Sequence, residues 1–148
     1  MRVWRQAVSV TAPLRHSAVD LSEELQRALK DSGVTDGFAV AFCEHTTCAL
    51  VINEWEQGLL ADVTRRLRTF VPDDDYYAHD DLSIRTENLV EEERVNGPAH
   101  VASIVLGATS QTIPVVGGDA ALGRWQKLFL LELDEPKDRT ITFHIYGA

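Results

Sequence analysis

The order of strand-like and helix-like segments is the feature that most constrains how this chain can fold. Strand-like runs either alternate in polarity or are rich in apolar and β-branched residues, and they occupy 3–10, 37–43, 48–53, 111–116, 127–133 and 140–146. The last three runs close the chain, whereas the helical patterns cluster in its middle. This grouping predicts the α+β class with a mainly antiparallel sheet.

The first of two longer helices is predicted from Leu21, where leucines recur at four-residue spacing along one face. Asp20 or Ser22 is expected to cap its start, because short polar side chains accept hydrogen bonds from the free N–H groups there. Gly33 is expected to end it, since glycine readily adopts the left-handed conformation at a helix C-terminus.

The second longer helix is predicted over 56–70 with Asn53 as its N-cap, and a short third helix over 98–106. Pro98 suits the first turn of the short helix because its missing N–H group would have no partner there, and Gly107 provides an exit. The sheet is therefore expected to pack with two longer helices and one short helix.

The composition fits a single domain that spans residues 1–148. The chain is 45% hydrophobic and has no repeat, low-complexity segment or linker-like stretch. Its formal net charge of -9 argues against binding nucleic acid or an anionic membrane through bulk positive charge. Its apolar runs are far shorter than the roughly 20 residues of a membrane span, and its start lacks the apolar region of a signal peptide. We therefore expect a cytoplasmic protein with no nucleic-acid or membrane partner.

Acidic residues concentrate in one long segment between the second and third predicted helices. The stretch 72–93 contains nine Asp or Glu residues and has no clear periodicity. It is longer than most loops of compact domains, and loops of this length are commonly functional or disordered. Because much of the negative charge belongs to this segment, the net charge does not exclude a local phosphate site elsewhere.

Two cysteines, Cys43 and Cys48, are too few for the disulfide framework of a small secreted protein. We expect two reduced, partly buried thiols, since free cysteine is among the most buried residue types. A disulfide is the alternative, because a tight turn between two paired strands could bring the Cα atoms to the roughly 5.5 Å that a disulfide requires. The sequence leaves both states open.

The five histidines fall into two groups. His16 lies in a loop and His144 within a strand, so both are expected to be structural or surface residues. His45, His79 and His100 instead occupy junctions between predicted elements, where binding and catalytic groups concentrate.

Convergence of these three histidines would create one of two kinds of site. Three neutral imidazoles can hold a divalent metal such as zinc and leave a fourth position open. Without a metal, the same side chains can act as general acid and base, because imidazole titrates near neutral pH. Their spacings of 34 and 21 residues match no compact metal motif, so spacing alone does not choose between these chemistries.

The start of the short helix is a second candidate feature. Its first N–H groups, near 96–99, lack helical partners and carry the positive end of the helix dipole, so they can bind a phosphate or carboxylate. The hydroxyls of Thr46 and Thr47 could donate to the same anion, or these two residues could simply form a turn.

Four motifs occur in an order that resembles the YjbQ-like family. They are HTTCALVINE at 45–54, YAHD at 77–80, NGPAHVAS at 96–103 and LGRWQ at 122–126. The resemblance covers about residues 36–147. Members of this family are often described as secondary thiamine-phosphate synthases.

The resemblance implies a small α+β domain that assembles as a homotrimer, with a site near the subunit boundaries. It also implies a divalent metal, zinc or magnesium, and an enzyme that joins a pyrimidine diphosphate to a thiazole phosphate and releases pyrophosphate. Three imidazoles favour zinc, whereas departure of a diphosphate favours magnesium held by carboxylates, so the identity of the metal stays open.

The family's site residues carry over onto this chain by position. The implied metal ligands are His45, His79 and His100, the implied catalytic residues are His79, Asp80, Asn96 and His100, and the implied substrate-binding residues are Thr46, Thr47, Asn53, Glu54 and Gln126. The chain departs from the family pattern at Trp55, Pro98 and Arg124. Pro98 leaves one fewer N–H group at the helix start, which weakens the case for an anion there.

These observations lead to one hypothesis and one alternative. The hypothesis is a metal-assisted enzyme that acts on phosphorylated small molecules, with thiamine-phosphate synthesis as the named reaction. The alternative is a non-catalytic trimeric protein that binds a metal or a small anion in the same histidine pocket.

Overall fold

The helices and strands lie close to the expected ranges within residues 1–107 and 109–148, which this computed structural model describes. The strands are β1 (Arg2–Val10), β2 (Ala18–Asp20), β3 (Asp36–Cys43), β4 (Cys48–Glu54), β5 (Ser110–Val116), β6 (Asp119–Ala120), β7 (Gln126–Glu132) and β8 (Arg139–Gly147). The helices are α1 (Ser22–Ser32), α2 (Gln57–Phe70) and α3 (Gly97–Leu106). The sequence does not predict β2 and β6, because runs of three and two residues are too short to have a recognisable period.

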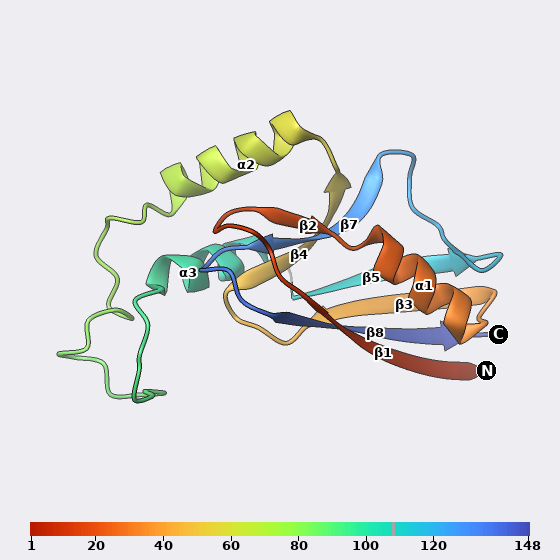
Figure 1. The fold of residues 1–148 in the computed structure, drawn as a ribbon, viewed down its shortest axis with the longest axis horizontal. Helices are drawn as coiled ribbons and strands as arrows, with labels where there is room; N and C mark the ends of the chain where they lie inside the picture. The colour runs from red at the N-terminus through yellow and green to blue at the C-terminus, as the bar shows by residue number, and fades with distance from the viewer. Residues whose placement is uncertain (108) are drawn as a thin grey trace.

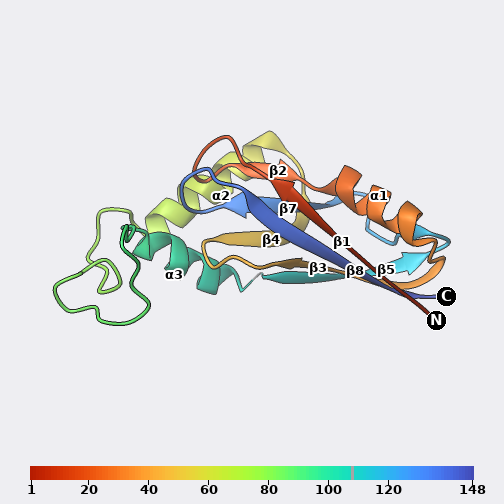
Figure 2. The same ribbon diagram turned by 60° about the horizontal axis from the view of Figure 1, so that its bottom comes forward.

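The strands divide between two antiparallel sheets. Sheet A has the strand order β1-β8-β3-β5-β6, and sheet B has the order β2-β7-β4. The short connection 44–47 carries the chain from sheet A to sheet B, since Cys43 pairs with Ile141 of β8 and Cys48 pairs with Glu132 of β7. The predicted α+β class and antiparallel pairing are confirmed, with two sheets in place of one continuous sheet (Figures 1 and 2).

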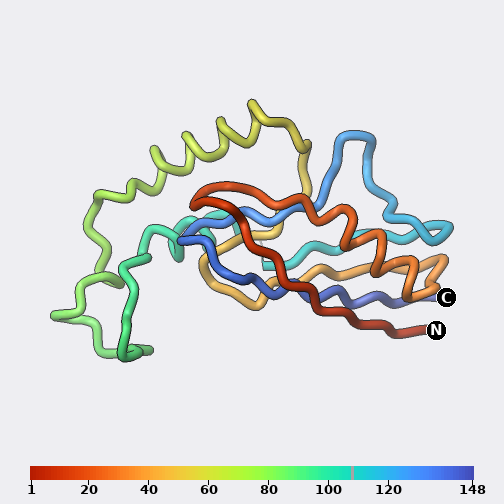
Figure 3. The backbone as a smooth tube through the Cα atoms, in the orientation of Figure 1, coloured from red at the N-terminus to blue at the C-terminus, as the bar shows by residue number. Residues whose placement is uncertain are grey.

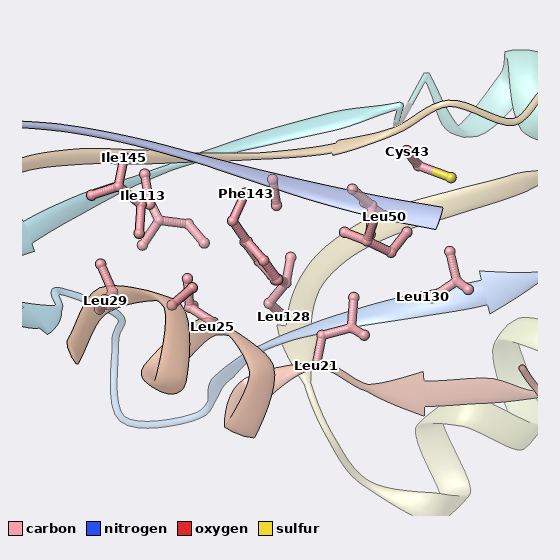
Figure 4. Packing of buried hydrophobic residues seen from close by; sticks show 14 of the residues in the cluster. Leu21, Leu25, Leu29, Cys43, Leu50, Ile113, Leu128, Leu130, Phe143 and Ile145 are labelled. Atoms are coloured by element: carbon pink, nitrogen blue, oxygen red, sulfur yellow. The ribbon is translucent and has the colours of Figure 1, made fainter. Parts of the chain in front are cut away.

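The main hydrophobic core fills the space between α1 and the inner faces of the two sheets. Leu21, Leu25 and Leu29 approach this core from the α1 side, and Phe143 approaches it from sheet A (Figure 4). The four-residue spacing of the leucines keeps them on one face of the helix, so the predicted stripe is also the buried one.

Strand β7 is buried on both faces, as its continuous apolar run suggests. Leu128 and Leu130 belong to the main core, whereas Phe129 and Leu131 belong to a second cluster beneath α2 and α3. This alternation follows from the period of two residues in a strand. Sheet B therefore forms a central layer with hydrophobic side chains on each side.

The N-caps of α1 and α2 both differ from the predicted residues. The N-cap position of α1 is Leu21, and Asp20 Oδ1 accepts a hydrogen bond from the Ser22 N–H at 2.8 Å. The N-cap of α2 is Glu56, so the prediction of Asn53 was wrong, because Asn53 still belongs to β4. Gly33 ends α1 in the left-handed conformation with φ of 63°, which confirms the predicted exit.

The acidic stretch lies within a segment, 71–96, that contains neither helix nor strand. It extends from one end of the molecule, away from the sheets (Figure 2). The two termini lie together at the opposite end, where Arg2 pairs with Gly147 (Figure 3). In the part of the chain that the structure describes, no helix is long and apolar enough to cross a membrane.

Candidate functional site

His79 and His100 lie side by side, although 21 residues separate them in the sequence. Their ring centroids are 4.5 Å apart, and the rings are tilted by 53°. His79 comes from the irregular acidic segment, and His100 comes from the first turn of α3. The fold therefore brings together two of the three histidines that the sequence singles out.

Asp80 caps the helix that carries His100. Its Oδ1 atom accepts hydrogen bonds from the N–H groups of Asn96 at 3.0 Å and Gly97 at 2.8 Å. Pro98 has no N–H group, and the Ala99 N–H donates to the Asn96 carbonyl at 3.0 Å. The predicted anion site on the N–H groups of 96–99 was wrong, because the chain's own carboxylate and backbone already satisfy these donors.

Asn96 joins the helix start to the segment that follows β7. Its Nδ2 atom donates to Asp134 Oδ2 at 3.1 Å, and the Lys137 ammonium donates to the same oxygen at 2.6 Å. Burial by itself would raise the pKa of Asp134, but the hydrogen bonds from Lys137 and Asn96 outweigh it and hold that pKa below its usual range. The Oδ1 atom of Asn96 is buried without a hydrogen-bond partner among the described residues, which leaves an acceptor at the site.

A cavity of about 540 Å³ opens beside the two imidazoles. Its lining residues are Thr46, His79, Arg85, Asn88, Val90, Glu92, Glu93, Arg94, Asn96 and His100. The sequence did not identify Arg85 and Arg94 as site residues, because the Asp and Glu residues around them make this segment acidic overall.

Arg85 holds the wall of this cavity together. Its guanidinium pairs with Glu93 at 2.8 Å, where both side chains are less than 15% exposed, and it also donates to the His79 carbonyl at 3.2 Å. Hydrogen bonds from the Val90 N–H and from Arg85 lower the pKa of Glu93. The acidic segment is thus fixed around His79 by an internal ion pair.

The surroundings of His100 favour its neutral form. Burial lowers its pKa, and the neighbouring His79 lowers it further. A neutral imidazole can accept a proton, and a second imidazole at 4.5 Å can exchange one with a bound molecule. The pair is therefore suited to general acid and base chemistry.

His45 takes a different position from the other two predicted histidines. Its Nε2 atom accepts a hydrogen bond from the Thr140 N–H at 2.8 Å, and it does not line the cavity. Across residues 1–107 and 109–148, no three His, Cys, Asp or Glu side chains are arranged to hold a metal ion. The donor set of a single chain therefore does not fit a three-histidine metal centre, and the metal stays a prediction.

The two threonines after His45 have separate environments. Thr46 lines the cavity, whereas Thr47 is buried, with its Oγ1 accepting a hydrogen bond from Arg139 at 3.0 Å. Arg139 also pairs with Glu132, and this ion pair is at most 2% exposed. Thr47 thus belongs to a buried polar network with Arg139 and Glu132, which the sequence did not reveal.

Asn53, Glu54 and Gln126 lie at the other end of sheet B. Glu54 pairs with Gln126, six residues along the ladder from the pair of Cys48 and Glu132. At about 3.3 Å per residue, this separation is roughly 20 Å. Within one chain, these three predicted substrate-binding residues are therefore not brought together with the histidine pair.

A larger cavity of about 880 Å³ lies between α2 and the segment around His16. It contains none of the predicted site residues. His16 has a φ of 60°, and its Nδ1 atom accepts a hydrogen bond from Arg68 at 3.1 Å. We take the smaller cavity as the candidate site because it contains the paired imidazoles, two arginines and the Asn96 acceptor, which has no partner within 1–107 and 109–148.

Comparison with known proteins gives consistent matches along the whole chain. The family model described as "UPF0047 protein YjbQ-like" matches residues 6–148. A UPF0047 protein from Methanothermobacter thermautotrophicus is 33% identical over 147 residues, which cover 99% of this chain and 94% of the relative. UPF0047 protein YugU from Bacillus subtilis is 29% identical over 143 residues, which cover 96% of this chain and 98% of the relative.

Solved structures agree with the fold described above. The crystal structure of a YbjQ-like protein of unknown function from Sulfolobus solfataricus has a TM-score of 0.84 at 31% identity and covers 99% of each chain. A hypothetical protein from Aeropyrum pernix has a TM-score of 0.83 at 29% identity, covering 98% of this chain and 99% of its own.

Proposed function

The chain belongs to the UPF0047 YjbQ-like family, and we propose that it is an enzyme that acts on a phosphorylated small molecule at the cavity beside His79 and His100. The observation that carries this proposal is the imidazole pair, 4.5 Å apart, in which the pKa of His100 is lowered. His100 acts as the general base, and His79 supplies or takes up the second proton.

The phosphate of the substrate binds to Arg94 in this proposal. Arg94 pairs with Glu135 at 2.9 Å, but both side chains are more than half exposed, so the pair is weak and a phosphate can replace the carboxylate. Arg85 is already paired with Glu93, so its charge is neutralised within the chain, and Arg94 is the arginine that can bind the phosphate. The net charge of -9 describes the whole chain and is compatible with a phosphate that binds to one arginine of the cavity.

The named reaction is the joining of a pyrimidine diphosphate to a thiazole phosphate with release of pyrophosphate. His100 or His79 manages the protons of this transfer, while Thr46 and Asn96 hydrogen-bond the bound molecule. A divalent ion, zinc or magnesium, would neutralise the leaving diphosphate. Since one chain does not group three metal ligands, we route no step through such an ion.

We propose further that the protein forms a homotrimer. Phe38 and Phe42 are more than 40% exposed on the outer face of β3 in sheet A, and Phe38 stacks on Tyr146 of β8 with centroids 5.2 Å apart. An exposed apolar face on a sheet is typical of a surface that another chain covers. Sedimentation of the purified protein tests the assembly, and lysine at both phenylalanine positions should give monomers. A parent protein that sediments as a monomer would contradict the trimer.

The enzymatic proposal is tested by comparing the purified parent with His79→Ala and His100→Ala. Thiamine phosphate formation and turnover of a panel of phosphorylated metabolites are measured together with metal content. His144→Ala, a histidine in β8 outside the cavity, is the matched control and should keep full activity. Loss of activity in both cavity variants supports catalysis by the pair.

The rival proposal is a non-catalytic trimer that binds a metal or a small anion. It predicts no turnover of any compound, together with binding of inorganic phosphate or zinc that depends on His79 and His100. Activity that survives both substitutions would refute the role of the histidine pair.

A further inference from the structure

The thiols of Cys43 and Cys48 face each other across the connection between the two sheets. Their Sγ atoms are 3.1 Å apart, and the residues are 1% and 0% exposed. Cys43 is the last residue of β3 in sheet A, and Cys48 is the first residue of β4 in sheet B. A bond between them would join the two sheets directly at the point where the chain crosses.

The geometry leaves little movement for such a bond. A disulfide has an S–S length of about 2.05 Å, so the sulfur atoms need to approach by roughly 1 Å. The four residues between the cysteines form a turn in which Glu44 and Thr46 are exposed, and exposed backbone can adjust more readily than a packed strand.

The two sulfur atoms share one hydrogen bond. The thiol of either residue can donate to the other, and both side chains belong to the main hydrophobic core. A sulfenic acid formed at either position would lie in contact with the remaining thiol. That thiol can therefore displace the oxygen and close a disulfide.

We propose that Cys43 and Cys48 form an oxidisable dithiol site that hydrogen peroxide converts into an intrachain disulfide. The thiolate of one cysteine attacks one oxygen of the peroxide, the O–O bond breaks, and the departing hydroxide takes up a proton as water. The sulfur of the other cysteine then attacks the resulting sulfenic acid, and the displaced hydroxide leaves with the proton of that second thiol as a second water. Two thiols are oxidised, and one peroxide is reduced to two waters.

This bond would change the backbone that supports the candidate site. The Cys48 carbonyl accepts a hydrogen bond from Ser103 of α3 at 3.0 Å, and Ser103 follows His100 by one turn of the helix. Thr46, which lies inside the closed ring, lines the cavity. Oxidation is therefore expected to shift the backbone of both Thr46 and α3, which line the cavity. The chemistry of the cysteine pair does not depend on the proposed enzymatic function.

The test treats the reduced full-length protein with hydrogen peroxide under native conditions. Free thiols are then counted with a maleimide mass tag after denaturation, and the intact mass is measured. We expect both thiols to disappear with a loss of two hydrogen atoms and no added oxygen, in a species that runs as a single chain on a non-reducing gel. Dithiothreitol should restore both thiols.

Two single variants test whether each cysteine needs the other. Neither Cys48→Ser nor Cys43→Ser can form the intrachain disulfide, so each should stop at the sulfenic acid of its one remaining cysteine, which dimedone traps. Amide resonances of Thr46 and Ser103 should shift on oxidation of the parent and return on reduction. The parent measurement stands alone if either variant fails to fold.

The outcomes that overturn the proposal are equally definite. If the parent keeps both free thiols at peroxide doses that saturate an exposed control thiol, the pair is not an oxidation site. If the disulfide joins two chains, the intrachain assignment is wrong. Neither result bears on turnover by His79 and His100, which is measured with the thiols reduced.

Discussion

Asp80 accepts hydrogen bonds from the backbone N–H groups of Asn96 and Gly97, at 3.0 and 2.8 Å. It therefore caps the helix that carries His100, although it precedes Asn96 by 16 residues in the chain. This single carboxylate ties the acidic segment to α3. It also replaces the external anion that the free helix start would otherwise bind. The positions of His79 and His100 therefore depend on a contact that is local in space and distant in sequence.

Removal of this cap should destabilise the protein. We expect Asp80→Ala to lower the free energy of unfolding by about 1 to 2 kcal/mol, because two backbone donors lose a charged acceptor. Asp80→Asn, which keeps an oxygen acceptor, should lose less. Urea denaturation measures both, and the exposed Asp74 gives the control variant Asp74→Ala, which should unfold like the parent. Equal stability of Asp80→Ala and Asp74→Ala would contradict the capping role.

Gly97 should not tolerate a side chain. A Cβ atom at this position would lie 2.8 Å from the Tyr77 Cβ and 2.9 Å from Asp80 Oδ2, so the acidic segment would have to move away from α3. We expect Gly97→Ala to cost about 1 to 3 kcal/mol of stability. Gly123→Ala is the matched control, because its nearest neighbour is the flexible Gln126 side chain at 3.3 Å. Thermal unfolding measures the stability of both variants, and equal melting temperatures for Gly97→Ala and Gly123→Ala would contradict the expected clash.

Removing one partner of the buried ion pair between Arg139 and Glu132 should destabilise the protein more than replacing both partners. Arg139→Met leaves the Glu132 carboxylate uncompensated in the interior, and we expect a loss of about 3 to 5 kcal/mol. Adding Glu132→Leu to that variant should recover part of the loss, since no buried charge remains. Arg94→Met, which breaks an exposed pair, should cost within about 1 kcal/mol. A double variant less stable than Arg139→Met would contradict this expectation, because the Glu132 carboxylate would then stabilise the fold without its partner.

The stability of the protein should fall as the pH drops from about 7.5 to about 5. Burial lowers the pKa of His16, and Arg15 and Arg68 lower it further against the opposing charge of Asp73. The unfolded chain therefore binds a proton at this residue at a higher pH than the folded chain does. The stabilising contribution of neutral His16 is fully present above the unfolded value of about 6.5 and is lost as the pH falls toward the lower folded value.

The pH effect is measured from urea midpoints of the parent and of His16→Asn. Asparagine tolerates the left-handed backbone of residue 16 and does not titrate, so the variant should lose less stability over this range. His45 and His100, whose pKa values are also lowered by burial, account for the dependence that remains. Identical slopes for parent and variant would remove His16 from this explanation.

The sequence predicted the elements of this fold well where the hydrophobic pattern was strong. The leucines of α1 and the apolar run of β7 identified the two surfaces on which the cores form. The cap of α2 was wrong because Asn53 and Glu56 are both acceptable caps by type, and only the length of β4 decides between them. β2 escaped prediction because its three residues form a strand only through pairing with β7.

The candidate site was predictable in part. His79, His100, Thr46 and Asn96 were identified from their motifs and lie around one cavity. Arg94 and Asp134 were missed because a charged residue near a turn has no signal in sequence that separates a site residue from a surface residue. The sequence did not predict that Gln126 lies far from the histidine pair, because the direction and register of β4 and β7 determine its position.

The sequence by itself determined the class of the fold, the helix faces that become buried and the residue types available for acid and base chemistry. These properties depend on local periodicity and side-chain chemistry, which any segment carries with it. The tertiary structure alone decided that His79 lies beside His100, that His45 hydrogen-bonds to Thr140, and that Cys43 contacts Cys48. These contacts depend on how distant segments cross, and the burial of hydrophobic surface between two sheets and α1 fixes that crossing for the whole chain at once.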